Sequence, residues 1–282
     1  MKQVNLQVII NHIEDLPTLP RTIMRITEII NDPRSSADDL SRIITDDQVL
    51  TARLLKLVNS SFYGFPQRIS TVAGAIVLLG FDSIRNLLLT SSIFDLFPKK
   101  GKRYTLEPDS LWDHSLGCAV GAKVIGSYIR HEKVEELFVA GLLHDIGKIV
   151  EMLYLRKDFE KAFFFAKENE TLLFRAENEI LGYNHAEVGK LLAERWNLPA
   201  KLVDVITYHH EPINSENMTL EIAVVHLADI LCRGMMIGSG GDSKIPQLDR
   251  GAWNLLQLKI GNISMIMKKM EQEILDIKKT IQ

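Results

Sequence analysis

Apolar residues recur along this chain at spacings of three and four residues, which place them on one face of an α-helix. The first such stripe consists of Leu19, Ile23, Ile26 and Ile30. Pro33 ends this helix, because a proline disfavours helical geometry in the residue before it. The sequence contains no alternating apolar and polar run bounded by hairpin turns. The hydrophobic pattern therefore predicts an all-α protein.

The N-terminal third of the chain reads as short helices packed as hairpins, at about residues 36–44, 49–58, 72–79 and 83–94. Ser36 and Asp39 have the spacing of a capping box at the start of the first of these helices. Gly80 and Asp82 separate the last two helices, as a C-terminal glycine followed by an N-cap.

The composition changes abruptly at Pro98–Arg103, which holds four basic residues, and Pro108 closes the break. This break predicts a two-lobed helical bundle. We expect an N-terminal helical lobe over residues 1–98, a second helical lobe over 106–240, and a C-terminal loop and amphipathic helix over 241–282. A closing helix of this kind more often packs on a core or forms a dimer than anchors a membrane.

The second half of the chain continues the helical pattern. Helices are predicted at about residues 109–129, 134–155, 158–168, 171–181, 185–196, 220–237 and 263–281, and a further helix is predicted to end at Tyr208. Gly238–Gly241 is predicted to be a loop. It opens no strand–turn–helix unit, so a phosphate-binding role is not assigned to it.

Composition places the chain among ordinary globular proteins. Of its 282 residues, 46% are hydrophobic and 24% are charged, and the net charge of −3 gives no general attraction to nucleic acid or acidic membranes. No segment has the uninterrupted apolar length of a membrane span, and Cys118 and Cys232 lie too far apart for a zinc ribbon. A cytoplasmic protein without membrane contact is expected. The basic run Lys99–Arg103 is read as a solvated loop, with a nucleic-acid contact as the weaker alternative.

Three polar residues interrupt the most apolar predicted helix, at 134–155. Burying the imidazole of His144, the carboxylate of Asp145 and the ammonium of Lys148 costs several kcal/mol unless each has a partner. Lys148 follows the other two by four and three residues, so it projects near both. One interpretation is an Asp145–Lys148 ion pair beside a core histidine, and the other is a metal site.

The remaining histidines and one aspartate favour the metal site. Helical bundles build metal sites from inward-pointing side chains on facing helices. The candidate ligands fall on different helices or helix ends, apart from two adjacent pairs: His114, His144, Asp145, His185, His209, His210 and Asp229. This set is about right for two metals that share a carboxylate. Imidazole and carboxylate suit iron or manganese, with zinc or nickel as alternatives, and no thiolate is expected to bias the choice.

His226 lies three residues before Asp229 and could also enter the site. Its apolar flanks favour a satisfied core histidine instead. His12 and His131 have polar or terminal surroundings and are set aside as solvated.

The order of His114, His144-Asp145 and Asp229 resembles the HD superfamily of metal-dependent phosphohydrolases. The di-metal HD-GYP branch of that superfamily has further ligands and a lysine at the positions that correspond here to His185, His209-His210 and Lys148. Residues 16 to about 212 resemble a narrower family, the HDOD or HD-related output domains of bacterial signalling proteins. The resemblance rests on Leu16–Pro20, Asp47–Leu55, Asn59–Gly64 and Ala75–Gly80, together with the stretch 182–199. HDOD domains are regarded as non-catalytic regulators. Pro212–Ser215 also stands where HD-GYP proteins have their Gly-Tyr-Pro segment.

The resemblance implies a specific metal centre. Asp145 would bridge two metals, one held also by His114, His144 and Asp229 and the other by His185, His209 and His210. If the site is catalytic, an activated water would attack phosphorus in line, and Lys148 would neutralise a phosphoryl oxygen or protonate the leaving group.

Two functions of different classes follow. The leading one is a signalling protein of the HDOD kind, acting through partner proteins that contact the N-terminal lobe around Asn59–Tyr63. The alternative is a metal-dependent phosphohydrolase acting on a nucleotide, a cyclic dinucleotide or another phosphodiester. A phosphate-containing small ligand and a homodimer are compatible with either function.

Overall fold

The computed structural model describes residues 25, 26, 29, 32, 34–59, 68–94 and 104–281. The predicted stripe before residue 25, the segment Ser60–Gly64 and the basic run at 99–103 fall outside these residues. Across the described residues the protein contains helices and loops and no strand. The prediction of an all-α protein is therefore confirmed.

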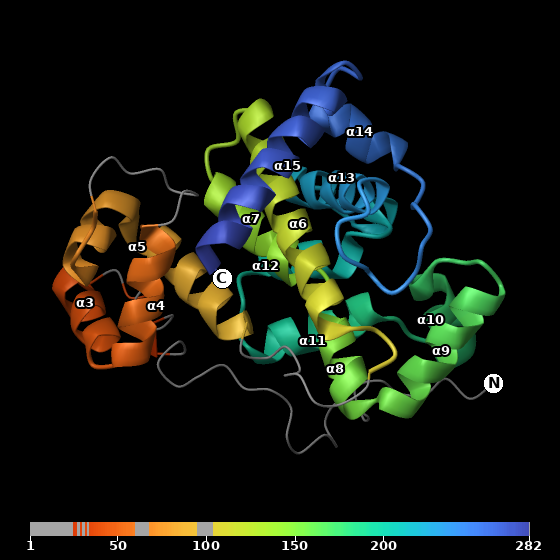
Figure 1. Cartoon of the computed structure of the whole chain (residues 1–282), viewed down its shortest axis with the longest axis horizontal. Helices are drawn as coiled ribbons and strands as arrows, with labels where there is room; N and C mark the ends of the chain where they lie inside the picture. The colour runs from red at the N-terminus through yellow and green to blue at the C-terminus, as the bar shows by residue number, and fades with distance from the viewer. Residues whose placement is uncertain are drawn as a thin grey trace. The chain divides into compact units, whose positions relative to one another are not determined.

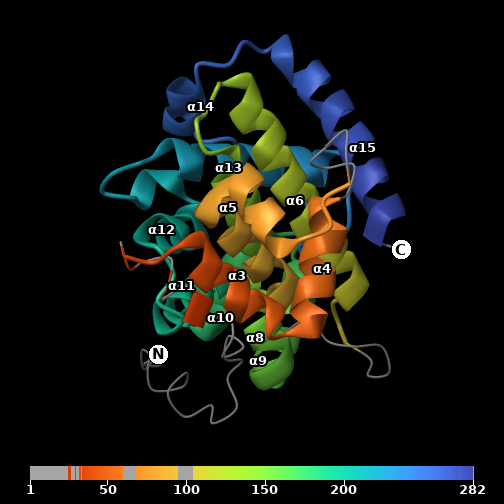
Figure 2. The same ribbon diagram turned by 90° about the vertical axis from the view of Figure 1, so that its left-hand side faces the viewer.

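Contact clustering divides the chain into two compact units, with boundaries at residues 96–97 and 270–271. The smaller unit contains α3 (Ala37–Thr45), α4 (Gln48–Val58) and α5 (Val72–Phe94), and it includes the end of α15. Helices α3 and α4 both pack on α5 and on each other (Figure 2). The Ser36 hydroxyl accepts a hydrogen bond from the backbone N–H of Asp39, whose carboxylate accepts one from the Ser36 N–H, so the predicted capping box is present.

Gly80 interrupts α5 as the sequence predicts. Its φ of 79° lies in the left-handed region, which is accessible to glycine at little cost, and it divides α5 into two helical segments. Leu54, Ile76 and Leu88 are among the apolar residues that fill the interior of this unit.

The larger unit holds the remaining described helices (Figure 1). Their bounds are α6 (Pro108–Tyr128), α7 (Val134–Leu143), α8 (Ile146–Tyr154), α9 (Arg156–Glu168), α10 (Leu173–Leu181), α11 (His185–Arg195), α12 (Ala200–Tyr208), the 3₁₀ turn η1 (Pro212–Asn214), α13 (Leu220–Gly234), α14 (Arg250–Leu256) and the first residues of α15 (Asn262–Ile281).

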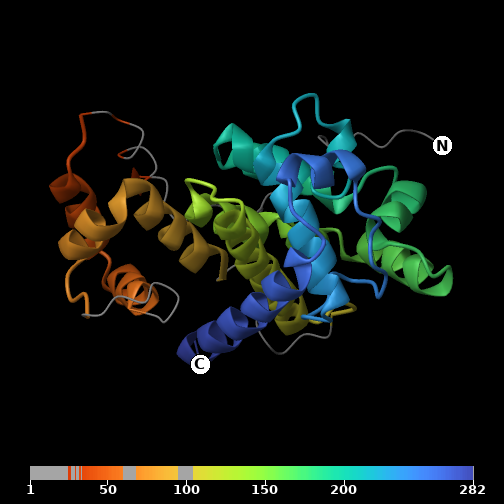
Figure 3. The same ribbon diagram turned by 90° about the horizontal axis from the view of Figure 1, so that it is seen from above.

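Helix α6 is the centre of the larger unit, because α7 and α13 both pack along it. Helix α15, drawn in blue in Figure 3, also contacts α6, where the Met270 side chain lies against Gly121. Most of α6 is buried, and small residues such as Gly117, Ala122 and Gly126 allow its neighbours to approach closely.

The predicted helix at 134–155 is broken, and this is the main difference from the sequence pattern. Helix α7 ends at Leu143 and α8 begins at Ile146, with Asp145 at φ −100° and ψ 15° between them. Two glycines explain the break, because each packs against a different backbone. A Cβ on Gly141 would lie 2.6 Å from the Cys118 carbonyl oxygen of α6, whereas a Cβ on Gly147 would overlap the His185 carbonyl oxygen of α11. One straight helix cannot follow both partners.

The chain after α13 also differs from its pattern. The predicted helix 220–237 ends at Gly234, and Met236 and Gly238 have positive φ values of 55° and 62°. The Gly238–Gly241 loop then returns to the start of α6, where the Ser239 N–H donates to the Ser110 carbonyl oxygen at 2.9 Å. Helix α14 is an additional short helix that the apolar pattern did not reveal.

None of the described helices is both long enough and apolar enough to cross a lipid bilayer.

Replacing Gly147 by alanine is expected to lower the free energy of unfolding by about 3 kcal/mol, because the new methyl group meets backbone atoms of α11 that cannot move aside. Gly261→Ala is the control, since nothing lies within 4 Å of a Cβ at Gly261, and it should change stability by less than about 0.5 kcal/mol. Chemical denaturation of both variants measures the difference, and equal stabilities would contradict the packing described for α8 and α11.

Candidate metal centre

All the predicted ligands come together in the interior of the larger unit. His114 lies on α6, His144 and Asp145 lie at the break between α7 and α8, and His185 is the first residue of α11. His209 and His210 directly follow α12, and Asp229 lies on α13. Together with one further residue, Cys118, their ligand atoms form two groups of four, each spanning no more than 4.8 Å. The first group is His114, Cys118, His144 and Asp229, and the second is Asp145, His185, His209 and His210.

The carboxylate of Asp145 joins the two groups. Its Oδ2 lies 3.5 Å from Nε2 of His114 and 3.3 Å from Nε2 of His144. Its Oδ1 lies 3.2 Å from Nε2 of His185 and 3.6 Å from Nε2 of His209. Each oxygen therefore faces one pair of histidines, which is the arrangement expected of a carboxylate shared between two cations. We call the two groups together the dinuclear site.

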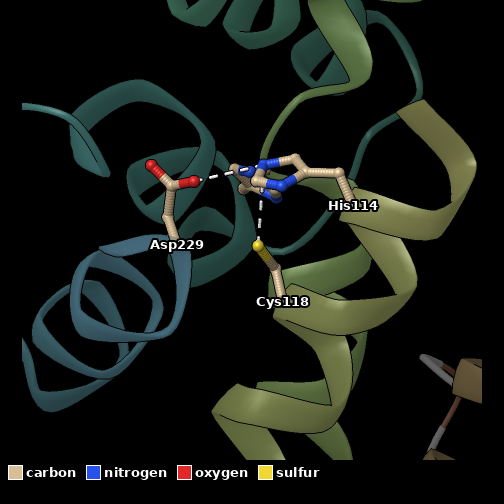
Figure 4. A group of neighbouring side chains, drawn as sticks. His114, Cys118 and Asp229 are labelled. Atoms are coloured by element: carbon tan, nitrogen blue, oxygen red, sulfur yellow. Dashed lines mark hydrogen bonds and ion pairs between the residues drawn. The ribbon is translucent and has the colours of Figure 1, made fainter. Parts of the chain in front are cut away.

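Cys118 belongs to the first group and was missed by the sequence analysis. It follows His114 by one helical turn on α6, and its Sγ lies 3.7 Å from Nε2 of His114 (Figure 4). Asp229 approaches the same nitrogen from α13, with Oδ1 at 3.1 Å. The expectation that no thiolate is available did not consider this sulfur, because it rested only on the spacing between cysteines. The i, i+4 spacing of His114 and Cys118 was the signal that could have identified the pair.

Three histidine rings are held by hydrogen bonds on their far side. Nδ1 of His144 donates to the Gly141 carbonyl oxygen at 2.7 Å, and Nδ1 of His209 donates to the Ile206 carbonyl oxygen at 2.9 Å. A carbonyl oxygen can only accept, so each Nδ1 carries the hydrogen and each Nε2 presents a lone pair to the site. Metal-binding histidines are oriented in this way.

Glu177 of α10 orients His185, the third ring. Its Oε2 accepts from the backbone N–H of His185 at 2.9 Å and from the ring Nδ1 at 2.6 Å. The start of α11 is fixed by Asn184, whose side chain accepts from the N–H groups of Ala186 and Glu187. The sequence analysis missed Glu177, because its contact with His185 crosses from one helix to another.

Electrostatics favour charged carboxylates but divide the imidazoles. Burial opposes protonation of His114 and His185, yet the carboxylates beside them raise the pKa of both rings. Burial alone would raise the pKa of Asp145, but the positive charges of His144 and Lys148 hold it well below its usual range. Asp229 behaves alike: burial opposes its charge, while Arg233 lowers its pKa. Burial lowers the pKa of His209 to about 4. Charged carboxylates and a neutral His209 are the states that metal ligands require at neutral pH, whereas His114 and His185 would release a proton when a cation binds.

The site passes a direct test of fit for cations. Oδ1 of Asp145 and the Nε2 atoms of His144 and His209 are buried and have no hydrogen-bond partner. Unpartnered buried polar atoms are costly, and three of them pointing at the same small region need a common partner. The donor set of imidazole and carboxylate fits two divalent cations.

Lys148 and Arg233 supply positive charge beside the ligands. Nζ of Lys148, a fully buried side chain, lies 2.6 Å from Oδ2 of Asp145. Arg233 donates to Asp229 at 2.9 Å and to both oxygens of Asp242 at 3.1 Å, which joins α13 to the loop that follows it. The sequence analysis did not select Arg233, although its position one turn after Asp229 makes the contact accessible.

His226 lies outside the dinuclear site, as expected. Its Nδ1 donates to the His209 carbonyl oxygen at 2.7 Å, and its Nε2 accepts from the Asp249 N–H at 3.0 Å. Both ring nitrogens therefore have protein partners.

Comparison with known proteins places this arrangement in context. The sequence model of the HDOD domain matches residues 16–212. An uncharacterized protein of Treponema pallidum is 26% identical over 256 residues, which cover 89% of this chain and 48% of that protein. Ribonuclease Y of Thermus thermophilus is 36% identical over 92 residues, or 33% of this chain and 11% of the enzyme. The matched part of the chain thus spans about half the length of the Treponema pallidum protein and about a tenth of the length of ribonuclease Y.

Solved structures share the fold over nearly the whole chain. An HDOD domain protein from Geobacter sulfurreducens superposes with a TM-score of 0.80 at 30% identity, covering 98% of this chain and 95% of that one. A protein from Shewanella amazonensis, provisionally named a phosphohydrolase, superposes with a TM-score of 0.73 at 24% identity, covering 98% and 97%. The second likeness concerns the fold alone.

Changing Glu177 to glutamine should weaken metal binding by roughly 10- to 100-fold, because a neutral amide orients His185 but no longer supports its basicity. Titration of the metal-free protein with Mn²⁺ or Zn²⁺ measures the affinity. Glu179→Gln, at an exposed position on the same helix, is the matched control. Equal affinities of the two variants would show that Glu177 does not act on the site.

Proposed function

The chain belongs to the HDOD family, and from this premise we propose that it is a regulatory protein of bacterial signalling that holds two divalent metal ions in the dinuclear site. The observation that carries the proposal is the carboxylate of Asp145, whose two oxygens each face a separate pair of histidines. Family membership supports the regulatory role, and the donor set supports the metal.

The residues divide naturally between two cations. The first cation would be held by His114, His144 and Asp229, and the second by His185, His209 and His210. Asp145 would contact both cations. Iron and manganese are the preferred metals for imidazole and carboxylate, with zinc and nickel as alternatives. Bound cations of this kind supply Lewis-acid stabilisation of anionic oxygen.

Burial of the ligands favours regulation over turnover. His114, His144, His185 and His209 are fully buried, and Asp145 is 2% exposed. Metals enclosed in this way stabilise the surrounding helices, because their binding free energy is linked to folding. We propose that metal occupancy sets the conformation that partner proteins recognise in the cytoplasm. The N-terminal lobe would provide the contact surface, and the smaller unit exposes the apolar side chains of Val77 and Leu78, at 79% and 58%.

A phosphohydrolase is the second candidate, and Lys148 is the observation that favours it. Its ammonium group lies within hydrogen-bond distance of the shared carboxylate, and the rest of its side chain is enclosed by protein. A positive charge held there could neutralise a phosphoryl oxygen or protonate a leaving group, with Asp145 balancing the charge of the ammonium group. Substrates would be phosphodiesters of the nucleotide or cyclic-dinucleotide class.

Metal content tests the first proposal. Protein purified without chelator should contain close to two transition-metal ions per chain, and Asp145→Asn should lose most of them because an amide cannot share a negative charge between two cations. Removing a ligand present at a hundredfold excess over its Kd lowers the free energy of unfolding by about 2.7 kcal/mol, so chelation should lower the Tm. His131→Ala, whose ring lies 3.7 Å from Glu221 and outside the site, should retain the metal. Metal-free protein after metal-replete growth, with a Tm indifferent to chelator, would exclude the proposal.

Hydrolysis of bis-p-nitrophenyl phosphate distinguishes the two functions. A regulatory protein should release nitrophenol no faster than free metal does. An enzyme should turn over this substrate, and Lys148→Met should then reduce kcat while leaving the metal content unchanged, since Lys148 is not a ligand. Elemental analysis of the variant is the necessary companion measurement.

A further inference from the structure

One nitrogen, Nε2 of His114, is crowded by more electron-rich atoms than one hydrogen bond accounts for. Three potential partners face it: Oδ1 of Asp229 at 3.1 Å, Oδ2 of Asp145 at 3.5 Å and Sγ of Cys118 at 3.7 Å. If the nitrogen carries a hydrogen, it can donate to a carboxylate but cannot accept from the thiol. If it carries a lone pair, it can accept from the thiol but faces the carboxylates unfavourably. A single hydrogen on Nε2 would be shared among two carboxylate oxygens and a sulfur, which is a weak acceptor, so one hydrogen bond accounts for Asp229 but not for the approach of all three atoms.

A cation among these atoms satisfies them together. Zinc-type ions bind sulfur at about 2.3 Å and imidazole nitrogen at about 2.0–2.1 Å, which at a tetrahedral angle separates the two ligand atoms by roughly 3.6 Å. The observed separation of Sγ and Nε2 is 3.7 Å. Nε2 of His144, which is buried and has no hydrogen-bond partner, lies in the same group of ligand atoms. It is an independent sign that the group is arranged around an ion.

We propose that Cys118 is a thiolate ligand of the first metal, together with His114, His144 and Asp229. The inference rests on the proposed metal centre and adds to it an asymmetry between the two halves. The half with Cys118 would take a thiophilic ion such as Zn²⁺, Fe²⁺ or Co²⁺, whereas the half with His185, His209 and His210 offers only nitrogen and oxygen. On binding, the S–H bond of Cys118 breaks, its electron pair forms the bond to the metal, and the proton leaves to solvent.

Cys232 contacts both Cys118 and His114 but is not in either group of ligand atoms, so it serves as the control for a buried thiol that touches the ligands without binding the metal. Its Sγ lies 3.5 Å from the carbonyl oxygens of His114 and Ile237, so its thiol has backbone acceptors of its own. Replacing it by serine preserves a hydroxyl donor to the same oxygens and changes the local volume little.

Cobalt spectroscopy tests the proposal on the full chain. Metal-free protein loaded with Co²⁺ should show visible d–d bands and a near-ultraviolet charge-transfer band from thiolate to cobalt. Cys118→Ser should lose the charge-transfer band and keep the d–d bands, and Cys232→Ser should keep both. A charge-transfer band that survives in Cys118→Ser, or d–d bands without charge transfer in the wild type, would overturn the assignment of Cys118 alone. The absence of all cobalt bands would overturn the metal centre itself and, with it, this inference.

A measurement on the wild type guards against a variant that does not fold. Zinc K-edge absorption of the zinc-loaded protein should contain a sulfur neighbour at about 2.3 Å from part of the zinc. A first shell made only of nitrogen and oxygen would refute the thiolate ligand, whatever the behaviour of the cysteine variants.

Discussion

A buried negative charge that must be compensated on both of its oxygens dominates the larger unit of this protein. Asp145 is almost completely enclosed, and its Oδ1 has no hydrogen-bond partner among the described residues. The groups within reach are Lys148 and four histidines. Burial of such a charge is tolerated only when partners surround it, so the helices that carry those partners have to converge on one point.

The fold meets this requirement by breaking a helix. The turn between α7 and α8 places Asp145 outside regular helical geometry, directly after His144, and glycines on either side allow the two helices to approach different backbones. Outer hydrogen bonds then set the ring orientations: the Gly141 and Ile206 carbonyl oxygens hold His144 and His209, and Glu177 holds His185. Orientation and burial together leave the Nε2 lone pairs of His144 and His209 without a hydrogen-bond partner, which supports the proposed metal centre over a set of satisfied core histidines.

The same features bear on the choice between regulation and catalysis. A metal bound between α6, α8, α11, α12 and α13 would couple its occupancy to the packing of these helices, and such coupling is useful for switching. Lys148 beside the shared carboxylate is the feature that an enzyme would need and a switch would not. If Cys118 is a ligand, the two metal positions differ in softness, and the protein could respond to the supply of one metal more than another.

The sequence alone determined the helical class, the capping box at Ser36 and the bend at Gly80, because these follow from local periodicity and from conformational preferences of single residues. It also selected seven polar residues that the structure brings together, since histidines and carboxylates in apolar helices need partners, and it set His226 aside correctly. Contacts between helices were decided only by the tertiary structure. The break at His144–Asp145, the support of His185 by Glu177 and the inclusion of Cys118 depend on which helices pack side by side. Periodicity reports which face of a helix is buried but not which neighbour it meets, so these features could not be read from the chain.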